Sequence, residues 1–84
     1  MDAATATRLS AIAAEMGQLQ NEIQERRRVR NFLLRSVRAV DPARKEARMR
    51  ATREHIEGLE ERLQALRAEQ QELIVHGTLG RLGD

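Results

Sequence analysis

The sequence predicts an all-α fold, a two-helix antiparallel coiled-coil hairpin that is completed by oligomerisation or by a partner protein. Three observations predict this fold. Apolar residues recur at alternating steps of three and four along two long segments, one proline separates these segments, and the two apolar stripes match when the chain folds back at that proline. No segment alternates apolar and polar residues with a period of two, so we expect no β-strand.

The first helix is expected over about residues 5–40, where most positions off the stripe are strong helix formers. Two positions of its stripe are occupied by Arg26 and Arg30 rather than by apolar residues. The apolar residues that would form its side of the seam between the helices are Leu9, Ile12, Met16, Leu19, Ile23, Leu33, Val37 and Val40.

The second helix is expected over about residues 42–76, with Asp41 as its N-cap and Pro42 in its first position. Gly77 is the expected left-handed stop, and residues 77–84 are interpreted as a short Gly/Leu tail after a hairpin domain of residues 1–76. The stripe of this helix consists of Met49, Thr52, Ile56, Leu59, Leu63, Leu66, Gln70 and Leu73.

The register of the hairpin follows from the two stripes. Facing stripe positions have residue numbers that add to 82, and a turn at residues 41–42 satisfies this sum where the only proline lies. The facing pairs include Leu9 with Leu73, Met16 with Leu66, Leu19 with Leu63, Ile23 with Leu59, Arg26 with Ile56, and Leu33 with Met49. A single long helix, kinked at the proline and held by partners, is the alternative shape.

Charged residues beside the stripes are expected to face one another as well. The predicted pairs are Glu22 with Arg62, Glu15 with Glu69, and Arg27 with Arg53. Because exposed pairs are each worth about 0–1 kcal/mol, two like-charged pairs among them do not overrule the apolar register.

Composition excludes several kinds of site. The chain has no cysteine, which excludes disulfides, a cysteine-based zinc site and a thiol nucleophile. Its one aromatic residue, Phe32, cannot form an aromatic stacking platform. The two histidines, His55 and His76, lie about six turns apart on one expected helix and cannot share a metal within it. We therefore expect no catalytic residue, no metal, no cofactor and no small-molecule substrate.

Charge is segregated along the chain. Residues 26–53 hold eleven basic side chains against Asp41 and Glu46, a charge of +9, and the rest of the chain carries −7. The candidate anion-binding or partner-binding residues at the turn end are Arg27, Arg28, Arg35, Arg38, Arg44, Lys45, Arg48 and Arg50. Their partner would be an acidic protein surface, nucleic-acid phosphates or the acidic end of a second copy. A solvated basic face without a partner is the alternative.

Apolar residues off the stripes predict a second interface, because one seam is a thin core for a chain of this length. These residues are Val29, Phe32, Leu34, Ile74, Val75, Leu79 and Leu82. Isolated apolar residues are also common on protein surfaces, which is the simpler interpretation. For Arg26 and Arg30 we expect packed stems with heads directed toward Glu54 and Glu57; alternatively, these arginines loosen the seam so that it opens onto a partner.

The predicted function is that of a non-enzymatic assembly protein, a small accessory subunit of a larger complex whose basic turn end docks on an anionic surface. The alternative is a dimeric regulator that contacts the phosphate backbone of nucleic acids through the same arginines. The sequence shows no signal peptide and no apolar stretch that could span a bilayer, so we expect a soluble protein in the cytoplasm or in a soluble assembly. Membrane contact through the basic amphipathic segment 29–40 is the least favoured alternative.

Overall fold

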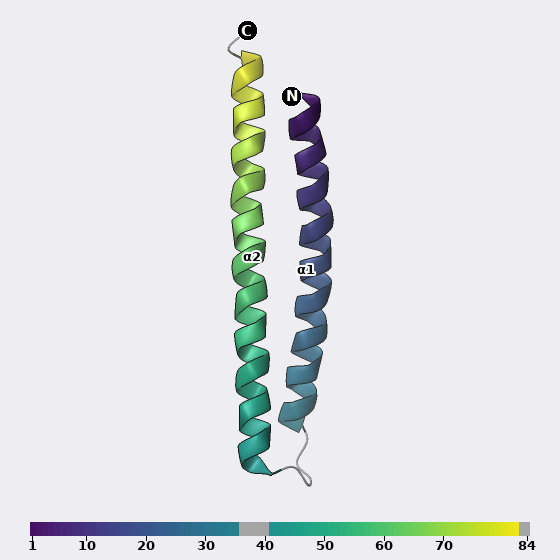
Figure 1. The fold of residues 1–84 in the computed structure, drawn as a ribbon, viewed down its shortest axis with the longest axis vertical. Helices are drawn as coiled ribbons and strands as arrows, with labels where there is room; N and C mark the ends of the chain where they lie inside the picture. Colours follow the sequence, from purple (N-terminus) through teal and green to yellow (C-terminus); the bar gives the residue numbers. More distant parts are fainter. Residues whose placement is uncertain (36–40, 83–84) are drawn as a thin grey trace.

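The protein is a hairpin of two long α-helices (Figure 1). The computed structural model describes residues 1–35 and 41–82, the last five of these by their backbone alone. Helix α1 comprises Ala3–Arg35 and helix α2 comprises Pro42–Leu82. They run side by side in opposite directions, with the start of α1 and the end of α2 at the same end of a rod that measures 67 × 15 × 15 Å (Figure 1). The predicted all-α hairpin is confirmed, and the alternative of a single long helix kinked at the proline is wrong.

Both helices begin at an aspartate that caps the first turn. At α2, the backbone N–H of Ala43 donates to Oδ1 of Asp41 at 3.1 Å, as the sequence predicts. At α1, the backbone N–H of Thr5 donates to Oδ1 of Asp2 at 2.7 Å, and hydrogen bonding by the Thr5 side chain and by this N–H lowers the pKa of the Asp2 carboxyl. The cap at Asp2 explains why α1 begins at Ala3, two residues before the expected start.

The end of α2 corrects the sequence-based boundary. The helix continues through Gly77 and Gly80 to Leu82, so the predicted stop at Gly77 is wrong. Glycine permits a left-handed stop but does not require one, and in a helix it costs only about 1 kcal/mol relative to alanine. A Cβ on Gly77 would lie 3.4 Å from Cε of Met1, so the start of the chain packs beside this turn of α2.

The hydrophobic core is the seam between the two helices. Ile12 and Leu66 have no exposed surface, and Thr52 is the one polar residue buried among the described residues. Buried with them are Ile23, Leu33, Ile56 and Leu63. The remaining described seam residues, Leu9, Met16, Leu19, Met49, Leu59, Gln70 and Leu73, are half-buried. Val37 and Val40, and the expected extension of α1 to residue 40, lie outside the described residues.

Ion pairs across the seam report the register. Three of them, Arg8–Glu69, Glu15–Arg62 and Glu22–His55, have residue numbers that add to 77. The fourth, Arg27–Glu60, adds to 87. These two values lie symmetrically about 82, because the first three pairs flank the seam on one side and the fourth pair flanks it on the opposite side. The ion pairs therefore agree with the register that the apolar stripes predict.

The predicted charge pairs beside the seam are wrong, although the register that led to them is right. Glu15 pairs with Arg62 rather than with Glu69, Glu22 pairs with His55, and Arg27 pairs with Glu60 rather than with Arg53. When two helices pack antiparallel, a residue that directly precedes a stripe position on one helix lies on the same side of the seam as a residue that directly precedes a stripe position on the other helix. Glu15 precedes Met16 and Arg62 precedes Leu63, which places the two side chains on the same side of the seam.

Candidate functional site

The candidate site is the end of the hairpin where the chain reverses, which we call the basic turn half and define as residues 26–35 and 41–53. It carries ten basic residues against two acids, Asp41 and Glu46. The ten are Arg26, Arg27, Arg28, Arg30, Arg35, Arg44, Lys45, Arg48, Arg50 and Arg53. Eight of them are exposed, and Arg30 and Lys45 are half-buried. Arg38, a further predicted binding residue, lies outside the described residues.

Several of these arginines project from the outside of the hairpin. Arg28 and Arg35 each lie two residues beyond a stripe position of α1, which places them on its outer side. On α2, Arg44 lies away from the seam, whereas Arg48 directly precedes the stripe residue Met49 and lies beside the seam. None of these four makes an ion pair with another described residue, whereas Arg27 donates to Oε1 of Glu60 at 3.0 Å. Arg28, Arg35 and Arg44, which we call the outward arginines, therefore present their full charge to the surroundings.

The start of α2 is an unfavourable place for cations. Its first turn contains no acidic residue, and Arg44 and Lys45 are the third and fourth residues of the helix. The N-terminus of a helix carries a partial positive charge, so a cation there costs up to about 1 kcal/mol where an acid would stabilise. Helix stability therefore does not account for the basic residues at this position.

Arg26 and Arg30 interrupt the apolar seam within the basic turn half. Arg26 is exposed although its position faces Ile56, and Arg30 is half-buried opposite Thr52. No ion pair joins either arginine to the glutamates at positions 54 and 57, which are both described and exposed. The continuous hydrophobic cluster lies between this interruption and the end of the rod where α1 begins. It is built on Ile23, Ile56 and Leu63, with Met16, Leu19 and Leu59 packed against it.

The apolar residues predicted to form a second interface are exposed but do not form one patch. Their exposed fractions are 39% for Val29, 71% for Phe32, 60% for Leu34, 43% for Ile74 and 49% for Val75. Val29 continues the row of Arg8, Glu15 and Glu22 at steps of seven, whereas Leu34 lies seven residues after Arg27 on the opposite side of the seam. Leu79 and Leu82 belong to α2, and their side chains lie outside the described residues.

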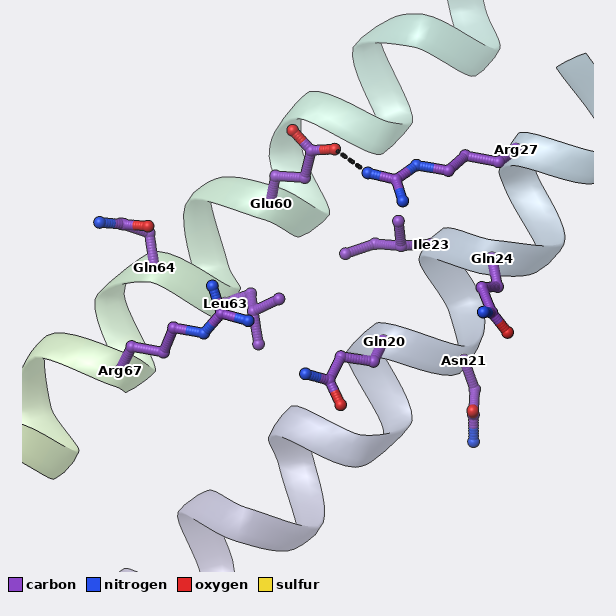
Figure 2. Close-up of a pocket in the computed structure, with 9 residues that line it drawn as sticks. All are labelled: Gln20, Asn21, Ile23, Gln24, Arg27, Glu60, Leu63, Gln64 and Arg67. Atoms are coloured by element: carbon purple, nitrogen blue, oxygen red, sulfur yellow. Dashed lines mark hydrogen bonds and ion pairs between the residues drawn. The ribbon is translucent and has the colours of Figure 1, made fainter.

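The two broad faces of the hairpin differ. The ion-pair face carries the three pairs that follow one another at steps of seven, Arg8–Glu69, Glu15–Arg62 and Glu22–His55. The opposite face, which we call the glutamine face, carries Gln20, Gln24, Arg27, Glu60, Gln64 and Arg67 around a groove of about 610 Å³. Figure 2 shows Ile23 and Leu63 between the helices in this groove, Gln20 and Arg67 extending toward each other, and the Arg27–Glu60 pair closing one end.

The groove was not predicted from the sequence. Its residues lie beside the stripes, and glutamine at such positions is typical of an ordinary solvated helix surface. The signal that could have found it is the difference between the two flanks at steps of seven, since pairing acids and bases recur along one flank while the other mixes apolar, amide and charged residues. A smaller hollow of about 180 Å³ lies in the basic turn half, between Arg28, Asn31, Phe32 and Arg35.

The described side chains do not assemble a metal site, because no three of their His, Asp and Glu residues are grouped to hold an ion. The shifted pKa values belong to surface groups. A hydrogen bond from Arg8 lowers the pKa of the Glu69 carboxyl, and the same contact raises the pKa of Arg8. Neither helix, over its described residues, has a stretch long and apolar enough to cross a membrane.

Comparison with known proteins does not place the chain in a family: no family model, no curated protein and no solved structure matches it.

Proposed function

We propose that this protein is a non-enzymatic interaction protein, a small helical-hairpin subunit of a larger assembly that docks its basic turn half on an anionic protein surface. The observation that carries the proposal is the excess of ten basic residues over two acids at this end of the described chain. Guanidinium groups bind carboxylates through two parallel hydrogen bonds, so clustered arginines fit a surface rich in Asp and Glu.

The arrangement of the basic residues supports a partner rather than a purely solvated face. Like charges at the same end of a narrow rod repel one another, and Arg44 and Lys45 add to this cost at the positive end of α2. An anionic partner would relieve both effects at once. The seam interruption at Arg26 and Arg30 lies in the same half, so the part of the hairpin with the least apolar packing is also the part that carries the positive charge.

The test compares two variants of the outward arginines with one control variant. Arg28→Gln/Arg35→Gln/Arg44→Gln removes three charges from exposed positions that make no described ion pair, so the helical content should not change. Arg28→Lys/Arg35→Lys/Arg44→Lys keeps the charge, and Arg67→Gln removes an exposed arginine from the open half as the matched control. Binding to fluorescent polyglutamate is measured by anisotropy from about 25 to 300 mM salt, where screening weakens exposed contacts.

We expect the glutamine triple variant to bind polyglutamate at least about tenfold more weakly, which corresponds to about 1.4 kcal/mol, and Arg67→Gln to bind as the unchanged protein does. Equal binding by the triple variant and the unchanged protein would contradict the assignment of the site. Absence of binding at the lowest salt would contradict the proposed function.

A phosphate-binding regulator is the second candidate, because the same outward arginines could also contact the phosphates of a nucleic-acid backbone without reading its sequence. Duplex DNA and RNA of unrelated sequence serve as probes in the same salt series. Tight binding whose logarithm falls steeply with the logarithm of salt concentration, and which exceeds binding to polyglutamate, would favour this candidate over protein docking.

A further inference from the structure

We propose that the glutamine face binds a second copy of this chain in the antiparallel direction, so that two hairpins form a four-helix bundle. The proposal concerns a different surface from the outward arginines of the basic turn half, so its experiment and that of the proposed function can fail separately. It rests on the asymmetry between the two broad faces, on the order of residues along the glutamine face and on the charge distribution along the rod.

The ion-pair face is closed, whereas the glutamine face is open. Three cross-helix pairs cover the first face along the open half of the rod. On the second face, among the described residues, one pair at Arg27 and Glu60 borders a groove of about 610 Å³ whose floor includes Ile23 and Leu63 (Figure 2). A side chain from another helix can therefore reach the flank of the core from this face.

The residues on the glutamine face complement one another when the face is reversed. At steps of seven, α1 presents Ala13, Gln20, Arg27 and Leu34, and α2 presents Arg53, Glu60, Arg67 and Ile74. A two-fold axis across the middle of the groove, level with about position 21 of α1 and about position 61 of α2, exchanges the two ends of this face. Leu34 then joins the layer that holds Ala13 and Ile74 of the second copy, and Glu60 faces the second copy's Arg67.

The open end of α1 has room for the incoming side chain. Ala13 and Gly17 are four residues apart and therefore lie on the same side of the helix. A Cβ on Gly17 would have no atom within 4 Å, so packing inside the hairpin does not require glycine at this position. Small residues beside the expected position of the second copy's Leu34 allow two helices to approach closely.

Charge selects the antiparallel direction over the parallel one. A parallel pair would bring two basic turn halves together, each with ten basic residues against two acids. An antiparallel pair instead places each basic turn half beside the acidic half of the other copy. The overlap along rods 15 Å wide gives roughly 800 Å² a copy, which equals the contribution of one partner to a standard interface. Because amides and charges dominate the face, the interface should be polar and hydrated.

The experiment uses the full chain, whose lack of cysteine allows single-site labelling. Sedimentation equilibrium at protein concentrations up to roughly 500 μM, where micromolar association is complete, should give twice the chain mass of 9.6 kDa. Spin labels on Ala47→Cys should lie about 40 Å apart in the antiparallel dimer, since the two sites are offset by about 28 residues at 1.5 Å each. Labels on Gln64→Cys, beside the axis, should lie within about 25 Å of each other.

Two matched substitutions separate this face from general surface apolarity. Leu34→Gln should weaken the dimer at least about tenfold, whereas Phe32→Gln should change its affinity less than about twofold, because Phe32 lies in the same half but on the other side of α1. Circular dichroism checks that both variants stay helical. A chain that remains monomeric would overturn the proposal, as would labels at position 47 less than about 25 Å apart, or equal effects of the two substitutions.

Discussion

Glu15 and Arg62, forty-seven residues apart in the chain, form a two-pronged ion pair across the seam. The Arg62 Nε donates to Oε1 of Glu15 at 3.0 Å and its Nη2 donates to Oε2 at 3.3 Å. One heptad away on either side lie the equivalent pairs Arg8–Glu69 and Glu22–His55. The helix that supplies the base changes along this row: it is α1 in the Arg8–Glu69 pair and α2 in the other two pairs. A parallel or shifted alignment of the helices would not bring these groups together.

The His55 position predicts a stabilising substitution. His55 Nε2 lies 3.2 Å from Oε1 of Glu22, and the pair is ionic only when the imidazole is protonated. His55→Arg should give a charged donor at every pH and raise the free energy of unfolding by about 0.3–1 kcal/mol near pH 8. Thermal unfolding of the variant at pH 8 and in added salt measures the gain. A gain that salt does not reduce would contradict an electrostatic origin.

The contact between Arg8 and Glu69 predicts a loss of stability in acid. Because Arg8 lowers the pKa of Glu69 in the folded state below its ordinary value of 4.5, the pair stabilises the fold above that value. This contribution is lost as the pH falls through the lowered pKa, where the carboxyl becomes protonated. Glu69→Gln should therefore be less stable than the unchanged protein at neutral pH and equally stable at about pH 2. Urea unfolding at the two pH values measures both differences, and a difference that persists in acid would rule out the ion pair as its cause.

The fully buried seam residues predict where the fold is most sensitive. Leu66 has no exposed surface, so Leu66→Ala should remove about 2–4 kcal/mol from the free energy of unfolding. The matched control is Val75→Ala on the same helix, where 49% of the residue is exposed and the cost should stay below about 1 kcal/mol. Urea unfolding of the two variants measures the contrast. Similar costs at both positions would mean that Leu66 does not lie in the seam.

The interrupted part of the seam predicts a gain in stability from apolar replacement. Arg26 and Arg30 occupy stripe positions opposite Ile56 and Thr52, where leucine would extend the hydrophobic cluster toward Leu33. Arg26→Leu/Arg30→Leu should raise the free energy of unfolding by about 1–3 kcal/mol. Thermal unfolding measures the gain, and anisotropy with polyglutamate measures binding. Higher stability with unchanged binding would show that these arginines have no role in docking, and lower stability would show that they are not seam residues at all.

The sequence was sufficient for the fold because the steps of three and four leave few alternatives. The stripe from Leu9 to Leu33 and the stripe from Met49 to Leu73 determine the helix faces, and Asp41 with Pro42 marks the start of α2, which the structure confirms. The end of α2 was not predictable in this way. A glycine at position 77 is compatible with a stop and with a continuous helix, and the contact that lies beside it comes from Met1 at the far end of the sequence.

The candidate site was predictable in position but not in detail. The accumulation of arginines between positions 26 and 53 is a property of composition and needs no coordinates. Which charges pair across the seam depends on the side from which each residue leaves the stripe, so the partners of Glu15, Glu22 and Arg27 required three dimensions. The groove of the glutamine face arises from the difference between two flanks, which becomes visible only when both helices are aligned in register.

The most direct test of the account is the distance between Ser10 and Gln71, two exposed residues near the open end on opposite helices. Spin labels on Ser10→Cys/Gln71→Cys, diluted with unlabelled protein so that only distances within one chain contribute, should lie within about 25 Å, since packed helix axes are about 8–10 Å apart. Sixty-one residues of continuous helix would instead separate them by about 90 Å at 1.5 Å per residue. A distance beyond about 60 Å would contradict the hairpin and, with it, the gathering of positive charge at one end of the rod.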